Sequence, residues 1–502
     1  MRNVTQPLSS LLTGLAGFDL VGSEAVSVTG ITCDSRKVVP GMVFVAVAGR
    51  REDGQLYVGE ALDRGARVIV SQAGDLPVGN RTLVRVADPR LAVSRLAAAW
   101  YGYPSRSLGI TGITGTNGKT SVSFLLRHIV RHQSGPCGLI GTVRYEIGDR
   151  HIPASRTTPD AVELQKLLRN MCDEGCKKVI MEVSSHALDQ DRVADVSFEL
   201  AAFTNLTRDH LDYHGNMEAY YLAKRRLFES LAQFEGRRAI VLNLDDGYGR
   251  RLKREMDDVR TVSFGIETNG TVDVSAEGIE CLPDGTQFEL VSHGTRQKVR
   301  LPLIGEYNVQ NCLATVALAT EMGYSLSDIA EALETVPGIP GRLEKVESGQ
   351  PFSVFIDYAH TADALQRVME TLKALSPKRL LLLFGCGGGR DQGKRSEMGR
   401  VAAEWADQSW ITNDNPRYED PQQIVEQIVA GMRAAGNQTW EVELNRRRAI
   451  EEVIAAAASG DVVLIAGKGH ETYQEIDGAV IPFDDRLYVE KSLENLASMQ
   501  GK

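Results

Sequence analysis

The chain has 502 residues, of which 43% are hydrophobic, and a formal net charge of −10. Its length allows about three domains, each with a core of its own. The acidic balance argues against a general nucleic-acid binder or membrane-surface binder, because phosphate-rich partners require clustered positive charge.

The seven cysteines, at positions 33, 137, 172, 176, 281, 312 and 386, are odd in number and scattered. This usage is typical of a reduced cytosolic protein and does not favour a zinc site, because no second close pair accompanies Cys172 and Cys176. No apolar stretch approaches the roughly 20 residues that a membrane span needs. We therefore expect a cytoplasmic protein without a membrane partner.

Residues 1–104 are predicted to form a small α/β domain. Short β-prone runs alternate with helical segments, and Tyr103-Pro104-Ser105 ends the last helix because proline cannot continue it. The predicted elements are strands over 26–33, 43–47 and 68–70 and helices over 61–66 and 91–100.

A glycine-rich segment, G-I-T-G-I-T-G-T-N-G-K-T-S at 109–121, joins a predicted strand to a predicted helix. This is the layout of a phosphate-binding loop, in which successive backbone N–H groups and the helix N-terminus face an anion. Lys119 supplies a positive charge, and the Thr120 hydroxyl is suited to Mg²⁺. The glycine spacing departs from the common pattern, whose first glycine would fall at Ile113. An ordinary turn does not require Gly-Lys-Thr at the start of a helix, so nucleotide binding is the stronger interpretation.

The central region, 105–337, alternates strands and helices and predicts a largely parallel sheet with helices on its faces. Ligands bind beyond the carboxyl ends of the strands in such sheets. Glu182 follows the predicted strand 178–181 and is therefore placed to meet Mg²⁺. A further strand, 200–203, leads into a loop with two aspartates and two histidines at 209–214, which are candidate metal ligands or acid–base groups.

Lys224 lies among apolar neighbours in a predicted helix. Such a lysine is more often an amphipathic stem than a reactive amine, and the sequence leaves both interpretations open. The remaining predicted elements of this region are the helix 217–231, the strand 239–243, antiparallel strands within 261–301 and the helix 305–322 with Asn308 and Asn311 on its first turns.

Residues 338–502 follow a Pro/Gly linker at 337–342 and predict a Rossmann-like, doubly wound domain. The glycine cluster at 385–389 lacks the G-x-G-x-x-G order and is weak evidence for a dinucleotide site. The expected fold is thus α/β with three domains, the middle one a P-loop ATPase-like parallel-sheet domain. The predicted strands of the last domain are 353–356, 379–384, 408–412 and 462–465.

Together, these motifs resemble those of the Mur ligases of peptidoglycan synthesis, and the resemblance spans the whole chain. The matching segments are G-T-N-G-K-T (115–120), M-E-V-S-S-H (181–186), T-N-L-T-R-D-H-L-D-Y-H (204–214), Y-x-x-A-K-x-x-L-F (220–228), G-x-x-N-x-x-N (305–311), D-Y-A-H-T (357–361) and G-K-G-H-E (467–471). The resemblance implies a UDP-sugar-nucleotide-binding domain at 1–104, an ATP-binding domain at 105–337 and an amino-acid-binding domain at 338–502.

The resemblance also implies a reaction. The D-N-P-R segment at 414–417 marks family members that add meso-2,6-diaminopimelate rather than lysine. The expected enzyme is an ATP- and Mg²⁺-dependent ligase, monomeric and cytoplasmic, that extends UDP-N-acetylmuramoyl-L-alanyl-D-glutamate through an acyl phosphate. The implied phosphate-binding residues are Gly115, Thr116, Asn117, Gly118, Lys119, Thr120 and Ser121. The implied catalytic residues are Lys119, Glu182, His210 and Lys224; Thr120, Glu182, His210 and Lys224, the last as a carbamate, would serve two Mg²⁺ ions.

Three groups of substrate-binding residues are implied in the same way. Cys33, Ser35, Arg50, Arg51 and Glu52 would contact the uridine nucleotide. Arg156, Thr157, Thr158, Ser184, Gln190 and Arg192 would bind the muramoyl-dipeptide, although some relatives carry Asn in place of Arg156. Arg390, Asp414, Asn415, Pro416, Arg417, Gly467 and Glu471 would bind diaminopimelate, whose extra carboxylate suits the bidentate guanidinium groups of Arg390 and Arg417.

Three alternatives are weighed against this interpretation. A lysine-adding ligase would lack an arginine at position 417. A folylpolyglutamate synthetase would not need the N-terminal nucleotide-sugar domain. A P-loop switch that hydrolyses ATP would not need a third domain with a polar pocket of its own.

Overall fold

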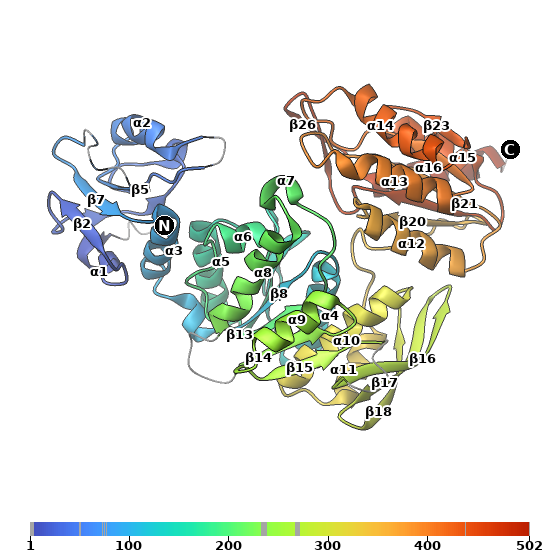
Figure 1. The fold of residues 1–502 in the computed structure, drawn as a ribbon, viewed down its shortest axis with the longest axis horizontal. Coiled ribbons are helices and arrows are strands. Elements are labelled where there is room, and N and C mark those ends of the chain that lie inside the picture. Colours follow the sequence, from blue (N-terminus) through green and yellow to red (C-terminus); the bar gives the residue numbers. More distant parts are fainter. Residues whose placement is uncertain are drawn as a thin grey trace.

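The computed structural model describes residues 5–49, 52–72, 74, 76, 78–231, 238–266, 272–436 and 438–500. Three principal sheets follow one another along the chain, each with its own helices, in the blue, cyan-to-yellow and orange-to-red parts of Figure 1. The predicted α/β class with three domains is confirmed. Within the described residues, no helix is long and apolar enough to cross a bilayer.

The N-terminal domain has a five-stranded sheet in the order β2-β7-β6-β5-β4, parallel except between β2 and β7. The predicted strand 26–33 is wrong as one element: β3 pairs with β1, whereas β4 joins the main sheet, and Thr29 and Gly30 lie outside both strands. The strands β2 and β7 were not predicted. The elements are β1 (Gln6–Pro7), α1 (Leu8–Leu12), β2 (Phe18–Val21), β3 (Ser27–Val28), β4 (Ile31–Thr32), β5 (Val43–Val45), α2 (Val58–Asp63), β6 (Val68–Ser71), β7 (Thr82–Val86) and α3 (Pro89–Trp100).

The middle domain is built on an eleven-stranded sheet in the order β11-β10-β9-β12-β8-β13-β14-β15-β16-β17-β18. The central part, from β9 to β15, is parallel, and an antiparallel ribbon extends it at each end. Its strands are β8 (Gly109–Thr114), β9 (Gly138–Ile140), β10 (Arg144–Ile147), β11 (Arg150–Pro153), β12 (Lys178–Glu182), β13 (Phe198–Phe203), β14 (Ala239–Asn243), β15 (Thr261–Phe264), β16 (Val274–Leu282), β17 (Gly285–Ser292) and β18 (Thr295–Leu301).

One prediction for this sheet needs correction. The segment 261–301 was expected to be antiparallel throughout, but β15 pairs in parallel with β14. The reason is the helix between them, because a helical crossover returns the chain in the same direction. Only β16, β17 and β18 form the expected antiparallel ribbon.

Helices cover both faces of the parallel strands. One core joins α4 and α10 through Leu125, Ile129 and Leu313, and the other joins α5 and α8 through Leu168 and Leu227. The sheet is therefore buried on both sides, and its strand ends are the accessible edge. The helices are α4 (Lys119–Ser134), α5 (Ala161–Asp173), α6 (Ser185–Asp189), α7 (Leu211–His214), α8 (Met217–Leu231), α9 (Gly247–Glu255), α10 (Glu306–Glu321) and α11 (Leu326–Glu334).

The C-terminal domain has a six-stranded sheet in the order β19-β20-β24-β21-β22-β23, parallel except between β19 and β20. The helices α12, α13 and α14 cover one face, and α15 and α16 cover the other, which confirms the doubly wound prediction. Its elements are β19 (Glu344–Val346), β20 (Ser353–Asp357), α12 (Ala362–Ala374), β21 (Leu380–Phe384), α13 (Gly393–Trp405), β22 (Gln408–Ile411), α14 (Pro421–Ala434), β23 (Trp440–Val442), α15 (Arg446–Ala456), β24 (Val462–Ala466), the hairpin β25 (Tyr473–Ile476) and β26 (Ala479–Pro482), and α16 (Asp485–Gln500).

Candidate active site

The glycine-rich loop between β8 and α4 requires glycine at two positions. Gly115 and Gly118 have φ values of +150° and +87°. A Cβ on Gly115 would collide with the Thr204 hydroxyl, and one on Gly118 with the side-chain oxygen of Asn311. Both neighbours come from other strand and helix ends of the middle domain, so the loop is fixed by tight packing against them.

The loop after β13 holds the phosphate loop in place. The backbone N–H of Thr116 donates to the Asn205 carbonyl at 2.9 Å, and that of Asn117 donates to the Asn205 side chain at 2.9 Å. The Thr204 hydroxyl in turn donates to the Asn117 carbonyl at 2.5 Å. These two N–H groups are thus committed within the protein, and the row of donors left for an anion begins further on, where α4 starts. Of the backbone N–H groups that the sequence predicts to face an anion, those of Thr116 and Asn117 therefore already have partners within the protein.

Two lysine side chains converge on one carbonyl oxygen. Lys119 Nζ donates to the Gly115 carbonyl at 2.9 Å and to the Thr116 carbonyl at 2.8 Å, and Lys224 Nζ donates to the same Gly115 carbonyl at 2.8 Å. Burial lowers the pKa of both amines, and the charge of Lys119 lowers that of Lys224 further. Lys119 thus places a positive charge beside the loop that attracts a polyphosphate, and the lowered pKa of Lys224 favours its neutral amine.

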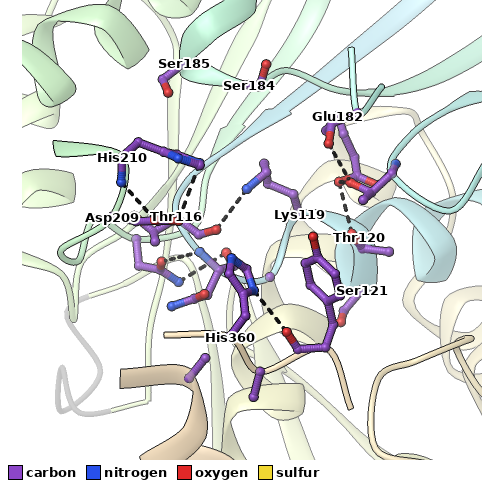
Figure 2. A pocket seen from close by; sticks show the side chains of 18 of the residues that line it. Thr116, Lys119, Thr120, Ser121, Glu182, Ser184, Ser185, Asp209, His210 and His360 are labelled. Carbon is purple, nitrogen blue, oxygen red and sulfur yellow. Dashed lines mark hydrogen bonds and ion pairs between the residues drawn. The ribbon is translucent and has the colours of Figure 1, made fainter. Parts of the chain in front are cut away.

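Glu182, at the carboxyl end of β12, is fully buried. Its carboxylate accepts from the Thr120 hydroxyl at 3.0 Å and from the backbone N–H and hydroxyl of Thr142 at 2.9 and 2.8 Å. Figure 2 shows Glu182 and Thr120 on one side of Lys119. The carboxylate and hydroxyl oxygens of Glu182 and Thr120 are the hard donors that Mg²⁺ prefers.

The donor set fits a magnesium ion that takes most of its ligands from substrate. Within the described part of the chain, no three His, Cys, Asp or Glu residues gather into a metal cluster. Mg²⁺ is commonly held by one or two protein oxygens together with substrate phosphates, so Thr120 and Glu182 suffice for such a site.

The opposite side of the loop carries the imidazoles. Figure 2 shows Asp209 and His210 across Lys119 from Glu182. His210 Nε2 lies 3.4 Å from Asp209 Oδ2, and burial lowers the pKa of His210. Burial alone would raise the pKa of Asp209, but the charges of His210, His360 and Lys394 hold it at about 2. Asp209 is therefore an ionised partner that can orient an imidazole.

These groups line one cavity of about 560 Å³ between the middle and C-terminal domains. It brings together most of the predicted phosphate, metal and dipeptide residues. Gln190 does not line the cavity, but its side-chain oxygen accepts from Arg192 Nε at 3.1 Å. The predicted residues that line it are Thr116, Asn117, Gly118, Lys119, Thr120, Ser121, Arg156, Thr157, Thr158, Glu182, Ser184, Arg192, His210, Lys224 and Arg390.

Two C-terminal residues that were not predicted complete the cavity wall. Arg342 is the last residue of the Pro/Gly linker, donates from Nη2 to the Thr120 hydroxyl at 3.2 Å and stacks on the Tyr358 ring at 4.7 Å. His360 lines the same wall, and burial lowers its pKa to about 4. No local pattern in the linker distinguishes Arg342 from an ordinary surface arginine.

Further contacts bring the two domains together at this cavity. Asp363, at the start of α12, accepts from the Asn117 side chain at 2.9 Å. Arg208, in the loop after β13, donates to Glu397 of α13 at 2.8 Å. Side chains of the two domains therefore contact each other beside the cavity, and Asp363 contacts the phosphate loop itself.

The predicted diaminopimelate residues form a second cluster, connected to the cavity through the glycine-rich loop of Arg390. The Gly388 backbone joins the two loops, since its N–H donates to the Asn415 carbonyl at 2.9 Å and its carbonyl accepts from Arg417 Nη1 at 2.7 Å. Asn415 contacts Glu471 at 2.9 Å. Asp414, Asn415, Pro416, Arg417, Gly467 and Glu471 lie in this cluster, outside the lining of the main cavity.

Two ion pairs with buried arginines lie next to the loops of this cluster. Arg446 binds Asp485 at 2.7 Å and donates to the Ala466 carbonyl at 3.0 Å, which fixes the end of β24. Arg395, fully buried, binds Glu419 at 2.9 Å. Arg446 begins the basic run Arg446-Arg447-Arg448, which composition alone predicts to be solvated surface charge, but its side chain is buried.

The predicted uridine residues lie apart from the cavity, in the N-terminal domain. Ser35 is buried and donates to Glu60 at 2.6 Å, Cys33 is exposed, and Glu52 accepts from the Tyr57 hydroxyl at 2.9 Å. Arg50 and Arg51 lie outside the described residues. None of the three described residues lines the main cavity.

Comparison with known proteins identifies the family. Three family patterns match: "Mur ligase family, catalytic domain" at residues 27–101, "Mur ligase middle domain" at 113–319 and "Mur ligase, glutamate ligase domain" at 341–469. The UDP-N-acetylmuramoyl-L-alanyl-D-glutamate–2,6-diaminopimelate ligase of Geobacillus thermodenitrificans is 44% identical over 483 residues, 95% of this chain and 97% of that protein.

Solved structures agree with this assignment. A structure of a UDP-N-acetylmuramoyl-L-alanyl-D-glutamate–2,6-diaminopimelate ligase is 34% identical, with a TM-score of 0.65 over 94% of this chain and 95% of that one. The folylpolyglutamate synthase of Mycobacterium tuberculosis is 19% identical, with a TM-score of 0.62 over 75% of this chain and 92% of that one, and shares the fold alone. The chain belongs to the Mur ligase family.

Proposed function

We propose that this chain is the ATP-dependent ligase that adds meso-2,6-diaminopimelate to UDP-N-acetylmuramoyl-L-alanyl-D-glutamate in peptidoglycan precursor synthesis. The observation that carries the proposal is the cavity between the two domains, which Lys119 and Lys224 line together with most of the predicted dipeptide residues. Relatives with this activity in their names match over nearly the whole chain. We expect the enzyme to act in the cytoplasm as a monomer.

The reaction requires two anions to meet. The γ-carboxylate of the D-glutamyl residue attacks the γ-phosphate of ATP, which gives an acyl phosphate and ADP. Lys119 reduces the repulsion between these anions, and the N-terminus of α4 binds the phosphates. The amine of diaminopimelate then attacks the acyl carbon, and phosphate leaves.

Thr120 and Glu182 would hold Mg²⁺, with His210 and Lys224 serving a second ion. When bound, Mg²⁺ neutralises phosphate charge. An ammonium group cannot ligate a cation, so Lys224 needs a chemical change for this role. Its lowered pKa supports that change, because a neutral amine reacts with CO₂ to give a carbamate, which carries oxygen ligands like a carboxylate.

We assign acceptor recognition to Arg390 and Arg417. Diaminopimelate differs from lysine by a second carboxylate, and guanidinium groups bind carboxylates by two parallel, charge-assisted hydrogen bonds. A site that presents a guanidinium group rejects lysine, because lysine has no second carboxylate to pair with that group. Such a site favours the diamino diacid over lysine.

The test is phosphate release from ATP with a panel of acceptors. We expect release to require both the UDP-muramoyl-dipeptide and meso-diaminopimelate, with lysine a poor substitute. Release with ATP alone would indicate a hydrolytic switch. Equal release with lysine would overturn the assigned specificity, and dependence on a folate in place of the nucleotide would overturn the substrate assignment.

A further inference from the structure

The side chain of Arg417 has an acidic partner within the protein. Arg417 Nε lies 3.0 Å from Glu475 Oε2, and both side chains are about three-quarters buried, at 22% and 26% exposure. Arg417 Nη1 donates to the Gly388 carbonyl at 2.7 Å. Part of the guanidinium is therefore already engaged by an internal carboxylate.

The backbone holds Glu475 at this place. The Arg417 N–H donates to the Glu475 carbonyl at 3.0 Å, and the Glu475 N–H donates to the Asn415 side chain at 3.0 Å. Glu475 lies on β25, one strand of the hairpin that covers the D-N-P-R loop. Since these contacts use the backbone of Glu475, a change of its carboxylate leaves them in place.

We propose that Glu475 is a counter-ion that takes the place of the acceptor's second carboxylate on Arg417 and thereby sets how strongly the site distinguishes a diamino diacid from lysine. The inference rests on the proposed function, in which Arg417 binds that carboxylate. Glu475 is a specificity-determining residue in this scheme and takes no part in the chemical steps.

The physical reason is the cost of leaving a largely buried charge without a partner. When the diacid binds, its carboxylate must share Arg417 with Glu475 or displace it, and two carboxylates on one guanidinium repel each other. When lysine binds, Arg417 keeps its partner Glu475, so the penalty that would exclude lysine is reduced. Glu475 therefore weakens diacid binding and softens the rejection of lysine.

The experiment measures kcat/KM for meso-diaminopimelate and for lysine with the full-length enzyme, saturating ATP and UDP-muramoyl-dipeptide. Lysine is also titrated as a competitor. Glu475→Gln is expected to raise the preference for the diacid by about tenfold, mainly through a lower KM for the diacid. Glu475→Asp, which withdraws the carboxylate by one methylene, should give an intermediate increase, and it serves as the second variant if the first folds poorly.

The double substitution separates this role from a structural one. In the Arg417→Ala background, Glu475→Gln should no longer change the preference. Glu404→Gln is the matched control, since Glu404 pairs with the exposed Arg400 at 3.3 Å on α13; its preference should equal that of the wild type.

The inference would be overturned if Glu475→Gln left the preference for the diacid unchanged or lowered it. It would also be overturned if Glu475→Gln changed the preference equally in the Arg417→Ala background. In both cases, wild-type activity with the diacid would leave the proposed function intact. A wild-type enzyme that is inactive with both acceptors would overturn the proposed function and this inference with it.

Discussion

The phosphate half and the acceptor half of the site are built in different ways. Around the phosphate loop, Lys224 and Glu182 are buried and Lys119 is partly buried, and all three are hydrogen-bonded to neighbouring backbone or hydroxyl groups. In the acceptor half, Arg417 is partly exposed and pairs with Glu475. The first half fixes charges where phosphate charge must be neutralised, whereas the second holds an ion pair that a ligand can exchange. Substitutions should therefore affect catalysis in the first half and acceptor choice in the second.

The largest expected effect comes from the phosphate half. Lys224→Ala should reduce turnover roughly a thousandfold, because it removes a buried group that faces the transferred phosphate. If Lys224 acts as a carbamate, added formate or acetate should restore part of the activity. Turnover is measured by phosphate release. Lys373→Ala is the control, since Lys373 forms an exposed ion pair with Asp407 outside the lining of the cavity. Full activity of Lys224→Ala without additive would contradict a catalytic role.

The next effect belongs to the acceptor half. Arg417→Ala should raise the KM for diaminopimelate by about 30- to 100-fold, because the second carboxylate loses its guanidinium. The KM for ATP should change less than about twofold, since the phosphate loop lies in the other half. Steady-state titration of each substrate measures both constants. An equal rise in both would mean that the two halves are not separate.

A smaller change is expected from a residue that supports the metal site. Thr142→Val keeps the side-chain shape but removes a hydroxyl that donates to Glu182 at 2.8 Å. The apparent affinity for Mg²⁺ should fall about tenfold, as expected when a partner of a metal ligand is lost. Magnesium titration of activity measures this, with Thr320→Val as a control on α10, where the hydroxyl binds only its own helix at 2.8 Å. An unchanged magnesium dependence would argue against Glu182 as a ligand.

The smallest effect concerns stability. Burial lowers the pKa of His186, His360 and His470 to about 3, 4 and 3, from 6.5. The unfolded chain therefore takes up protons first as the pH falls, so the free energy of unfolding is highest above about pH 6.5 and decreases toward pH 4. His360→Gln should reduce this decrease by about 1–2 kcal/mol between pH 7 and 5. Denaturant unfolding at both pH values measures it; an identical slope would contradict the buried, neutral state of His360.

The sequence predicted the regular parts of the fold and the residues at the strand ends. The apolar runs of β8, β12 and β14, with the glycine and proline residues that separate elements, were enough to predict the parallel sheet of the middle domain. Glu182 could be placed because its position at a strand end follows from local order alone. The parallel pairing of β15 was missed because it depends on the crossover helix before it, and local alternation does not report pairing direction.

Other parts of the site could not be predicted because they depend on distant packing. Arg342 donates a hydrogen bond to Thr120 across the domain boundary, and Asn205 accepts hydrogen bonds from the N–H groups of Thr116 and Asn117. The pairing of Arg417 with Glu475 joins the D-N-P-R loop to the strand β25, far apart in the chain. Such contacts arise only when domains and loops are assembled, so residue spacing carries no trace of them.

The central claim is that ATP activates the carboxylate of the dipeptide as an acyl phosphate. It is tested most directly by labelling the D-glutamyl γ-carboxylate with ¹⁸O and analysing the phosphate released during turnover with diaminopimelate. Because the attacking carboxylate oxygen stays with the phosphoryl group when the amine displaces it, one labelled oxygen should appear in each phosphate formed. Phosphate without the label, released while the amide is formed, would contradict the account.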